Sequence, residues 1–419
     1  MRFTQVLYKQ DIGRLIKWQW RAQRKKSLIE TNAYKILASK NIPVIDATTI
    51  LREPILEAQK QDVQQILNNI VGPCKLPQKN DDTHPLWNDE PCLVFSDHNV
   101  LVQGLDQAKV FTNSVEPSSG LPQHLQDLFE AYKIPNQDDH VKRIINASVM
   151  YDSIQEKLPI KKDKERPAWN FPRDYGIPTK RRVHLLASRL VQLCDSSVGS
   201  MCSKKLLTKD VFFKVPLQRN SNVSLDIRAD LLLLSDNPLS PFIENVLGKL
   251  PDIYPLDYKV SLDEKNIYKK DEFVSPISGK YNNVHTVIIN YDETEVKNLY
   301  ETPVKESQIF GRSLMKCYAI AVANAKSKFG DTIENLSEPI SLQCIQTNAH
   351  WFHFSTFQLN TLCGPEENGK RNAFWQTPLI NLYSKCCYEE GIPVLKDYNP
   401  DVFKHFLTFY MNGTEYGAN

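Results

Sequence analysis

The order of strand-like and helix-like segments in the second half of the chain restricts the fold more than any other feature. Runs rich in apolar, β-branched and aromatic residues predict strands. They are "VFFKVPL" (211–217), "SLDIRADLLLL" (224–234), "YPLDYKVS" (254–261), "HTVIINY" (285–291), "ISLQCIQT" (340–347) and "WFHFSTFQLNT" (351–361). The last two predict a hairpin. Helices are expected over 313–330, near 379–389 and over 400–411. This order predicts a mixed α/β core domain over 183–419, with a central mixed sheet flanked by helices.

The first half of the chain divides by composition into three regions. Residues 1–50 are a basic N-terminal region, 51–160 a mixed and mostly helical region, and 161–182 a basic extended arm. Within the second region we expect helices at about 124–133 and 141–158. The segment 93–112 predicts a strand and a turn that lead into a short helix or a second strand. A long helix is expected to start near Val183, directly after the arm.

The N-terminal 26 residues carry eight Lys or Arg against a single acid, Asp11. The apolar residues among them fall near helical spacing. An amphipathic, Arg-bearing and acid-poor N-terminus is typical of a mitochondrial transit peptide, although this one is not Ser-rich. The alternative is a basic arm that stays on the protein and binds RNA.

Charge and cysteine content exclude several classes of protein. The net charge of +2 predicts no nucleic-acid partner by itself, so any such binding depends on local patches. The nine cysteines include no C-x-x-C pair, which favours reduced thiols over disulfides or zinc ligands. We expect no metal and no cofactor. The longest apolar runs are too short to span a bilayer.

Asp257, Tyr258 and Lys259 lie in the middle of a segment predicted as a strand. Since side chains on a strand alternate, Asp257 and Lys259 would share a face. Asp230 precedes them by 27 residues at the start of "DLLLL". Carboxylates on neighbouring strands can bind magnesium, which lowers the pKa of bound water. The arrangement resembles the core of restriction-endonuclease-like nucleases, in which the Lys positions the attacking water.

The match to such a nuclease is incomplete. That family usually has a Gln shortly before an aromatic residue on the following helix, but the helix here has apolar Leu314 upstream of Tyr318 and no Gln there. No helical carboxylate lies upstream in the expected register. We therefore predict a degenerate, inactive core in which Asp230, Asp257 and Lys259 are vestigial and can pair with one another without metal. A working metal-dependent nuclease is the alternative.

The tract 161–182 carries eight basic residues against three acidic ones, with aromatic residues between them and prolines that keep it extended. Cations suit phosphate contacts, and rings can stack on unpaired bases. The candidate RNA-contacting residues are Lys161, Lys162, Lys164, Arg166, Trp169, Phe171, Arg173, Tyr175, Lys180, Arg181 and Arg182. The alternative is a solvated linker whose aromatic residues pack into the core.

Other possible sites favour structural interpretations. His350 and His353 are three positions apart, so on a strand they would face opposite ways and could not bind one metal. Trp351, Phe357 and Leu359 would form part of the sheet core. Cys386 and Cys387 are expected to be a buried helical pair, not a redox centre.

Two stretches resemble a known family: "HPLWNDEPCLVFSDHNVLVQGLDQAKVFT" (84–112), and "WFHFSTFQLNT" (351–361) together with "NPDVFKHFLTFYMNG" (399–413). They are similar to the family of the metazoan mitochondrial large-ribosomal-subunit protein thirty-seven, a relative of the programmed-cell-death-nine ribosomal protein. The residues that carry the resemblance are His84, Pro85, Leu86, Asp89, Cys92, Phe95, Gly104, Gln107, Ala108, Phe352, His353, Phe354, Phe357, Gln358, Leu359, Asn360 and Thr361, with the small block Asn266-Ile267-Tyr268.

The resemblance covers most of the chain after about residue 80. It implies a structural, non-enzymatic constituent of the large mitochondrial ribosomal subunit, located in the matrix and bound to the ribosome. The implied partners are the mitochondrial large-subunit ribosomal RNA and other ribosomal proteins. Among these, the programmed-cell-death-nine relative is the expected heterodimer partner.

Overall fold

The structure is a computed structural model that describes residues 16–21, 31–44, 92–159, 173–218, 222–244, 246, 248–265, 272–277, 279–299, 302–331, 333–365 and 369–414. The chain divides into two compact units, Met1–His84 and Pro85–Asn419. This boundary differs from the one expected near residue 183. Residues 85–160, which precede the arm, belong to the larger unit, and a strand that they form lies inside its sheet.

The N-terminal unit contains helix α2 (Asn32–Ser39) and a helical segment at 16–21. The hydroxyl of Thr31 accepts a hydrogen bond from the Tyr34 amide at 3.4 Å and so caps α2. Residues 45–91, which include much of the region expected to be mostly helical, lie outside the described residues.

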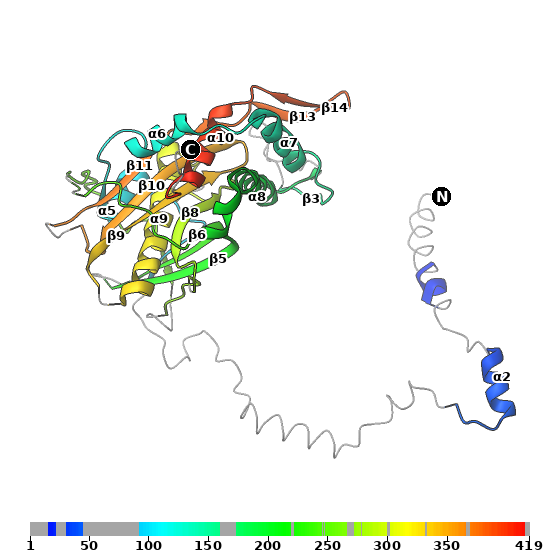
Figure 1. Cartoon of the computed structure of the whole chain (residues 1–419). Helices are drawn as coiled ribbons and strands as arrows, with labels where there is room; N and C mark the ends of the chain where they lie inside the picture. Colours follow the sequence, from blue (N-terminus) through cyan, green and yellow to red (C-terminus); the bar gives the residue numbers. More distant parts are fainter. Residues whose placement is uncertain are drawn as a thin grey trace, which may run out of the picture. The chain divides into compact units, whose positions relative to one another are not determined.

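Ten strands form one mixed sheet within the described part of the larger unit (Figure 1). Its path runs β2-β11-β10-β9-β8-β6-β1-β7, and β12 and β5 pair with β10 and β6. The strands are β1 (Cys92–Ser96), β2 (Ser114–Val115), β5 (Lys205–Gln218), β6 (Asn222–Ser235), β7 (Asp263–Lys265), β8 (Asn283–Asn290), β9 (Asn335–Thr347), β10 (Trp351–Thr361), β11 (Asn372–Gln376) and β12 (Ile380–Asn381). The prediction of a mixed sheet flanked by helices is confirmed.

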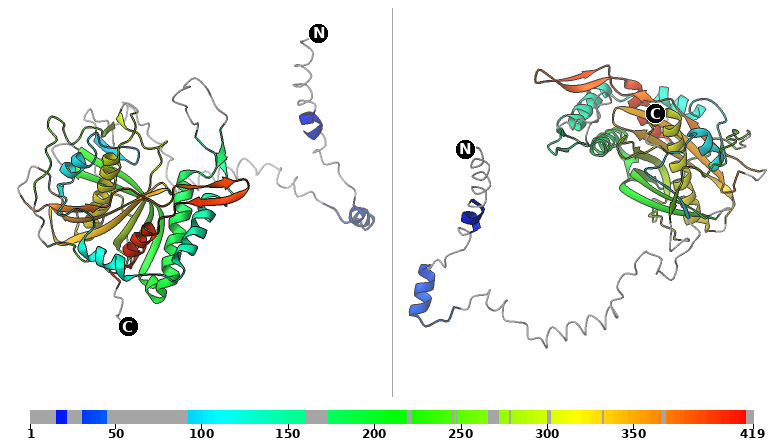
Figure 2. Two further views of the ribbon diagram at one scale, coloured as in Figure 1. Left: turned by 90° about the horizontal axis from the view of Figure 1, so that it is seen from above. Right: turned by 180° about the vertical axis from the view of Figure 1, so that it is seen from behind.

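Helices cover both faces of this sheet. They are α5 (Leu105–Phe111), α6 (Gln123–Ala131), α7 (Gln137–Val149), α8 (Thr179–Val198), α9 (Glu306–Phe329) and α10 (Pro400–Met411), with a 3₁₀ turn at Gly199–Lys204. Figures 1 and 2 show α5 and α9 on one face and α6, α7, α8 and α10 on the other. Two small ladders complete the unit: β3 (Glu156–Lys157) with β4 (Tyr175–Gly176), and β13 (Lys385–Glu389) with β14 (Ile392–Lys396).

Strand β10 shows why the two cores form where they do. Side chains alternate between the faces of a strand, so Phe357 and Leu359 pack with α9, whereas Phe352 and Phe354 pack with α8 and α10. All four side chains are completely buried. The predicted hairpin is confirmed, because β9 and β10 pair antiparallel. Trp351 is only half-buried and lies in a smaller cluster with Tyr291.

Helix α9 lies against α5 at a glycine–glycine contact. A Cβ atom on Gly311 would lie 2.7 Å from the carbonyl carbon of Gly104, and one on Gly104 would lie 2.5 Å from the Ser307 carbonyl. Gly104 also has a φ of +61°, which disfavours other residues. Both glycines are required by this close approach of two backbones, which fixes α9 beneath the sheet.

The segment 254–261 is a turn, so its prediction as a strand is wrong. Pro255 has no amide hydrogen to donate to a ladder, and the Asp257 carboxylate accepts the Lys259 amide at 2.9 Å. The side-chain amide of Gln107 on α5 then donates to the carbonyls of Tyr258 and Val260 at 3.1 and 2.8 Å. These side-chain bonds satisfy backbone groups that a strand would pair with its neighbour.

The helix expected near 379–389 is also wrong, because strands β12 and β13 lie there. Glu390 and Gly391 both have positive φ values and form the two-residue turn into β14, a geometry that favours a hairpin. Cys386 and Cys387 therefore lie on a half-buried strand and are not a buried helical pair.

Two helix boundaries also differ from prediction. The helix expected over 141–158 is α7, which ends at Val149. The long helix begins at Thr179 and thus includes the last residues of the tract predicted to be an extended arm. Pro178 directly precedes it, and a proline at a helix start costs no hydrogen bond.

Candidate functional site

A polar pocket of about 420 Å3 lies where strand β6 changes neighbours. On one side, β1 runs parallel to β6 as far as the pair Ser96 and Asp226. Beyond a gap at 227–230, β8 pairs antiparallel with β6 from Leu231 onward. The carboxyl ends of β1 and β8 therefore face each other across the gap. In open α/β sheets such a change of strand neighbour is where ligands commonly bind.

Two cations on α9 form the base of this pocket. Arg312 and Lys316 are 4% and 1% exposed and lie one helical turn apart. The Lys316 ammonium lies 2.5 Å from the Asp97 carboxylate and donates to the Arg228 carbonyl at 3.0 Å. The Arg312 guanidinium donates to the carbonyls of Asp97 at 3.3 Å and Asn290 at 3.2 Å.

Carboxylates satisfy the backbone amides of the gap. The Asp97 carboxylate, just after β1, accepts the Arg228 amide at 3.1 Å from each oxygen. Asp230 accepts the Asn290 amide at 2.7 Å. These side chains replace ladder partners that β6 lacks here, so the cluster joins β1, β6, β8 and α9.

The electrostatics of the cluster follow from burial and pairing. Burial opposes ionisation of Asp97, but the charges of Lys316 and Arg312 and the hydrogen bonds outweigh it and lower the pKa of this carboxyl. Burial lowers the pKa of Lys316, the Arg312 charge adds to that effect, and Asp97 opposes it. Burial likewise lowers the pKa of Arg312, against the attraction of Asp97 and Asp230.

Of the three vestigial nuclease candidates, only Asp230 lines this pocket; Asp257 and Lys259 do not. Among the described residues neither forms an ion pair with the other or with Asp230, so that predicted pairing is wrong. The Lys259 ammonium instead lies 5.3 Å from the Tyr258 ring centroid. The part of the chain that the structure describes also contains no group of three His, Cys, Asp or Glu side chains that could hold a metal ion.

The sequence interpretation missed Asp97, Arg312 and Lys316. One signal could have found the two cations: they occur four positions apart in "GRSLMKCYAIAVANA", a helix that is otherwise apolar on all sides. A charged side chain on a helix that has no polar face is expected to be buried, and so to need a partner inside the protein. Leu314, between them, is completely buried.

The two histidines singled out in the sequence have different partners. His353 is completely buried, with its Nδ1 3.1 Å from the Ser313 hydroxyl and its Nε2 3.2 Å from the Gln376 side chain. Burial lowers the pKa of His353 to about 4, so it is neutral at physiological pH. His350 precedes β10 and packs against Tyr383. Both residues serve packing.

The predicted RNA-contacting residues fall into three groups. Lys161, Lys162, Lys164, Arg166, Trp169 and Phe171 lie outside the described residues. Arg173 and Tyr175 are exposed, and Tyr175 lies on β4, where Lys157 is 5.7 Å from its ring centroid. Lys180, Arg181 and Arg182 lie in the first turn of α8. Lys180 pairs with Asp210 at 3.3 Å and Arg181 pairs with Asp152.

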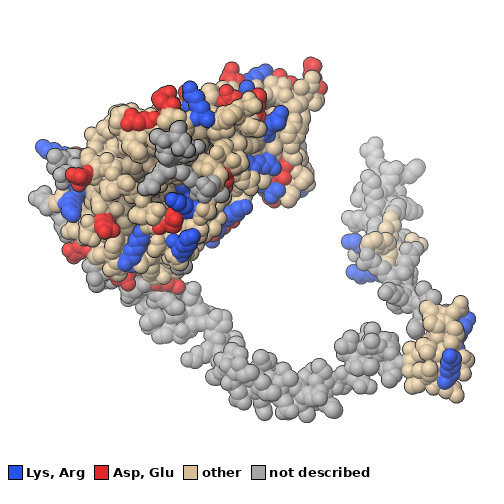
Figure 3. Space-filling view, in the orientation of Figure 1, with Lys and Arg blue, Asp and Glu red and all other residues tan. Residues whose placement is uncertain are grey.

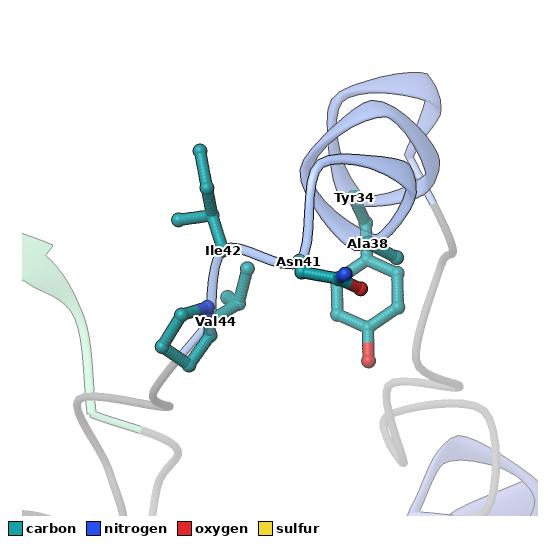
Figure 4. A pocket seen from close by; sticks show the side chains of 6 residues that line it. Tyr34, Ala38, Asn41, Ile42 and Val44 are labelled. Atoms are coloured by element: carbon teal, nitrogen blue, oxygen red, sulfur yellow. The ribbon is translucent and has the colours of Figure 1, made fainter.

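Two surface features add no chemistry. A shallow hollow of about 320 Å3 lies in the N-terminal unit between α2 and the chain that follows it, lined by Tyr34, Ala38, Asn41, Ile42, Pro43 and Val44 (Figure 4). On the face of the larger unit seen in Figure 3, acidic and basic side chains are interspersed.

None of the helices within the described residues is long and apolar enough to cross a membrane.

Comparisons with known proteins match this chain to ribosomal proteins. A family model described as "Mitochondrial 28S ribosomal protein S30 (PDCD9)" matches residues 294–414, from just before α9 to just after α10. "Large ribosomal subunit protein mL37" of Rattus norvegicus is 26% identical over 356 residues, which cover 78% of this chain and 77% of that protein. The proteins of the same name from Mus musculus and Gallus gallus are 26% and 25% identical to this chain, and the matched regions cover 77% and 76% of those proteins. The resemblance inferred from the sequence is confirmed.

Proposed function

We propose that this chain is a structural protein of the large subunit of the mitochondrial ribosome and supports mitochondrial translation by binding ribosomal RNA and neighbouring ribosomal proteins. The observation that carries the proposal is the similarity to large-subunit proteins over 78% of this chain and 77% of theirs. The family model is described as a 28S protein, but it covers only residues 294–414. The longer matches therefore decide in favour of the large subunit, and the chain acts in the mitochondrion.

A non-enzymatic role accords with the chemistry of the polar pocket. A hydrolytic magnesium site needs several oxygen ligands around an open position. Here the Lys316 ammonium bonds the Asp97 carboxylate, and Arg312 lies beside it. The Asp97 oxygens are thus already bonded to an ammonium, and Asp230 accepts the Asn290 amide, which supports a structural role for these two carboxylates over a metal cage. The restriction-endonuclease-like resemblance remains a hypothesis about ancestry, and nothing favours the nuclease alternative.

For RNA contact we propose the loop between β3 and β4. The two strands pair Glu156 with Gly176 and Lys157 with Tyr175, and the Leu158 amide donates to the Asp174 carbonyl at 2.9 Å. Residues 156–158 and 174–176, which flank most of the charges of the basic tract, are thus held together on the larger unit. The exposed Tyr175 ring is placed where a base could stack on it.

For a protein partner we propose the programmed-cell-death-nine relative. The support is the family model itself, which bears that name and matches the segment from α9 to α10. A chain that shares these elements could pair with this one through equivalent surfaces.

Sedimentation of a tagged copy through a sucrose gradient tests the proposal. We expect the full chain to co-sediment stoichiometrically with the large mitochondrial subunit. A tagged chain found only at the top of the gradient, with intact ribosomes lower down, would contradict the proposal.

Charge reversal tests the RNA-contacting loop separately. Lys161, Lys162, Lys164 and Arg166 are better targets than Arg181, because Arg181 already pairs with Asp152 and its reversal would disturb the fold. Reversal of the four charges should reduce incorporation into the subunit, while charge reversal of Lys249, an exposed cation outside the loop, should not. Unchanged incorporation of the loop variant would show that the loop is only a linker.

A further inference from the structure

The donors at the base of the polar pocket are already used inside the protein. Lys316 bonds the Asp97 carboxylate and the Arg228 carbonyl, and Arg312 bonds the carbonyls of Asp97 and Asn290. Cations at the mouth also have partners. Lys180 lies 3.3 Å from Asp210, Lys265 lies 3.6 Å from Asp263, and the Arg228 guanidinium lies 5.8 Å from the Phe212 ring centroid.

The acceptors of the pocket are not matched in this way. Asp226, Asp230, Asp292 and Glu295 all line it, and within the described residues none of them forms an ion pair. Asp226 accepts only the Ser224 hydroxyl, at 2.6 Å, and Asp230 accepts only the Asn290 amide. Carboxylate oxygens have room for several donors each, so capacity remains on both sides of the gap.

Asn290 gives a second and independent indication. It is 6% exposed and lines the pocket, and its side-chain oxygen accepts no hydrogen bond from any described residue. Buried polar atoms are nearly always hydrogen-bonded, so an exception calls for an explanation, and a donor from outside the chain is one such explanation. The unmet acceptor capacity of the pocket therefore lies on the Asn290 side-chain oxygen and on the four carboxylates.

We propose that this pocket binds the guanidinium group of an arginine side chain from a neighbouring protein. A guanidinium has five N–H donors and no acceptor, and its planar fork matches carboxylate oxygens. An RNA phosphate brings acceptors and negative charge, so it would be repelled by the same carboxylates. The inference goes beyond the proposed function and does not depend on it, because the pocket's chemistry is independent of the assembly.

Calorimetric titration of the full chain at low salt tests this. The probe is a capped Gly-Gly-Arg-Gly-Gly peptide, and its control has neutral citrulline, of nearly the same shape, in place of arginine. We expect the arginine peptide to bind at least about tenfold more tightly, because charge-assisted hydrogen bonds are lost in the control. Equal affinities, or no binding of either peptide, would overturn the proposal.

Three variants locate the binding. Asp230→Asn keeps an acceptor for the Asn290 amide and should weaken the arginine peptide about tenfold. Glu295 is exposed, so Glu295→Gln leaves the fold intact, and it should weaken binding of the arginine peptide by a smaller factor. Asp257→Asn makes the same change of charge outside the pocket and should have no effect. A short oligouridylate serves as the competing class of ligand. Its displacement of the arginine peptide, or a loss of affinity in Asp257→Asn equal to that in Asp230→Asn, would contradict the proposal.

Discussion

Two lysines on opposite faces of the sheet have different surroundings. Lys316, on the α9 face, is 1% exposed and lies 2.5 Å from the Asp97 carboxylate. Lys205, at the start of β5 on the α8 and α10 face, is half-buried. Its ammonium donates to the Tyr410 carbonyl and lies 4.1 Å from the ring centroid of that residue. The nearest carboxylate, Asp195, accepts a hydrogen bond from the Tyr410 hydroxyl.

The two lysines differ in the groups that oppose the effect of burial on their pKa. Burial lowers the pKa of Lys205 to about 7, although Cys194 and Asp195 favour the charge. The pKa of Lys316 is lowered by burial and by Arg312, but a directly bonded carboxylate opposes both. A carbonyl and a ring at a helix end stabilise the charged form of Lys205. A carboxylate in direct contact stabilises the charged form of Lys316, and loss of either partner of that pair destabilises the fold.

The largest effect is expected for Lys316→Met. It leaves the half-buried Asp97 carboxylate without its ammonium partner, which should lower the free energy of unfolding by about 3 kcal/mol. Urea denaturation measures this. Adding Asp97→Asn should cost less than the sum of the two single changes, since the charge left behind is removed. Additive losses would show that the two residues do not act as a pair.

The next effect is the pH dependence that Lys205 contributes. The pKa of Lys205 is about 7 in the folded chain, against an ordinary value of 10.5, so the unfolded chain binds the proton more tightly. Unfolding then takes up a proton between about pH 7 and 10, and stability rises with pH in that window by up to about 1.4 kcal/mol per unit. Denaturation at pH 7 and 9 should show this rise in the wild type but not in Lys205→Met. Parallel behaviour of the two proteins would contradict the lowered pKa.

A smaller effect is expected for Lys205→Met at pH 7 alone. The variant loses the bond to the Tyr410 carbonyl but also the cost of burying an ammonium, so its free energy of unfolding should stay within about 1 kcal/mol of the wild type. A loss as large as that of Lys316→Met would mean that a carbonyl and a ring hold the charge as firmly as a carboxylate does.

The smallest effect is expected for Asp257→Ala and Lys259→Ala, which extend the comparison to a lysine in the surface turn at 254–261. An exposed charge contributes about 0–1 kcal/mol, so stability and ribosome incorporation should stay near normal. Purified protein should not cut nucleic acid with magnesium or manganese. Cleavage that disappears in Asp257→Ala would restore the nuclease alternative.

The bounds of an element were predicted correctly where a single hydrophobic period, of a strand or of a helix, runs through the whole segment. Strand β10 has the bounds predicted from "WFHFSTFQLNT", and α10 has the expected bounds 400–411, with Asn399 capping it just before Pro400. Sequence reasoning failed where side chains bond the backbone. The apolar residues of "YPLDYKVS" resemble a strand, but Asp257 bonds the Lys259 amide and Gln107, about 150 positions earlier, holds the turn.

The candidate site was predictable only in part for the same reason. Asp230 was found because it precedes a strongly apolar run, and it does line the pocket. Its neighbours Asp97 and Lys316 come from a turn and a helix that no local pattern connects. The spacing of Asp257 and Lys259 suggested a partnership that exists only if the segment is a strand. An error in one element thus removed two of the three residues from the predicted site.

The position of the earliest strands in the sheet has a consequence for how the protein is made. Strand β1 lies between β6 and β7, and β2 pairs with β11 near the other end of the chain. The Asn372 side chain donates to the Thr112 carbonyl at 2.8 Å, across 260 positions. During synthesis or import from the N-terminus, β1 must wait for β6, α5 for α9 and β2 for β11, and all of these partners lie in the second half of the chain. Contacts of such sequence separation form slowly and leave apolar surface exposed meanwhile, so folding of this chain should depend on a chaperone that holds its first half.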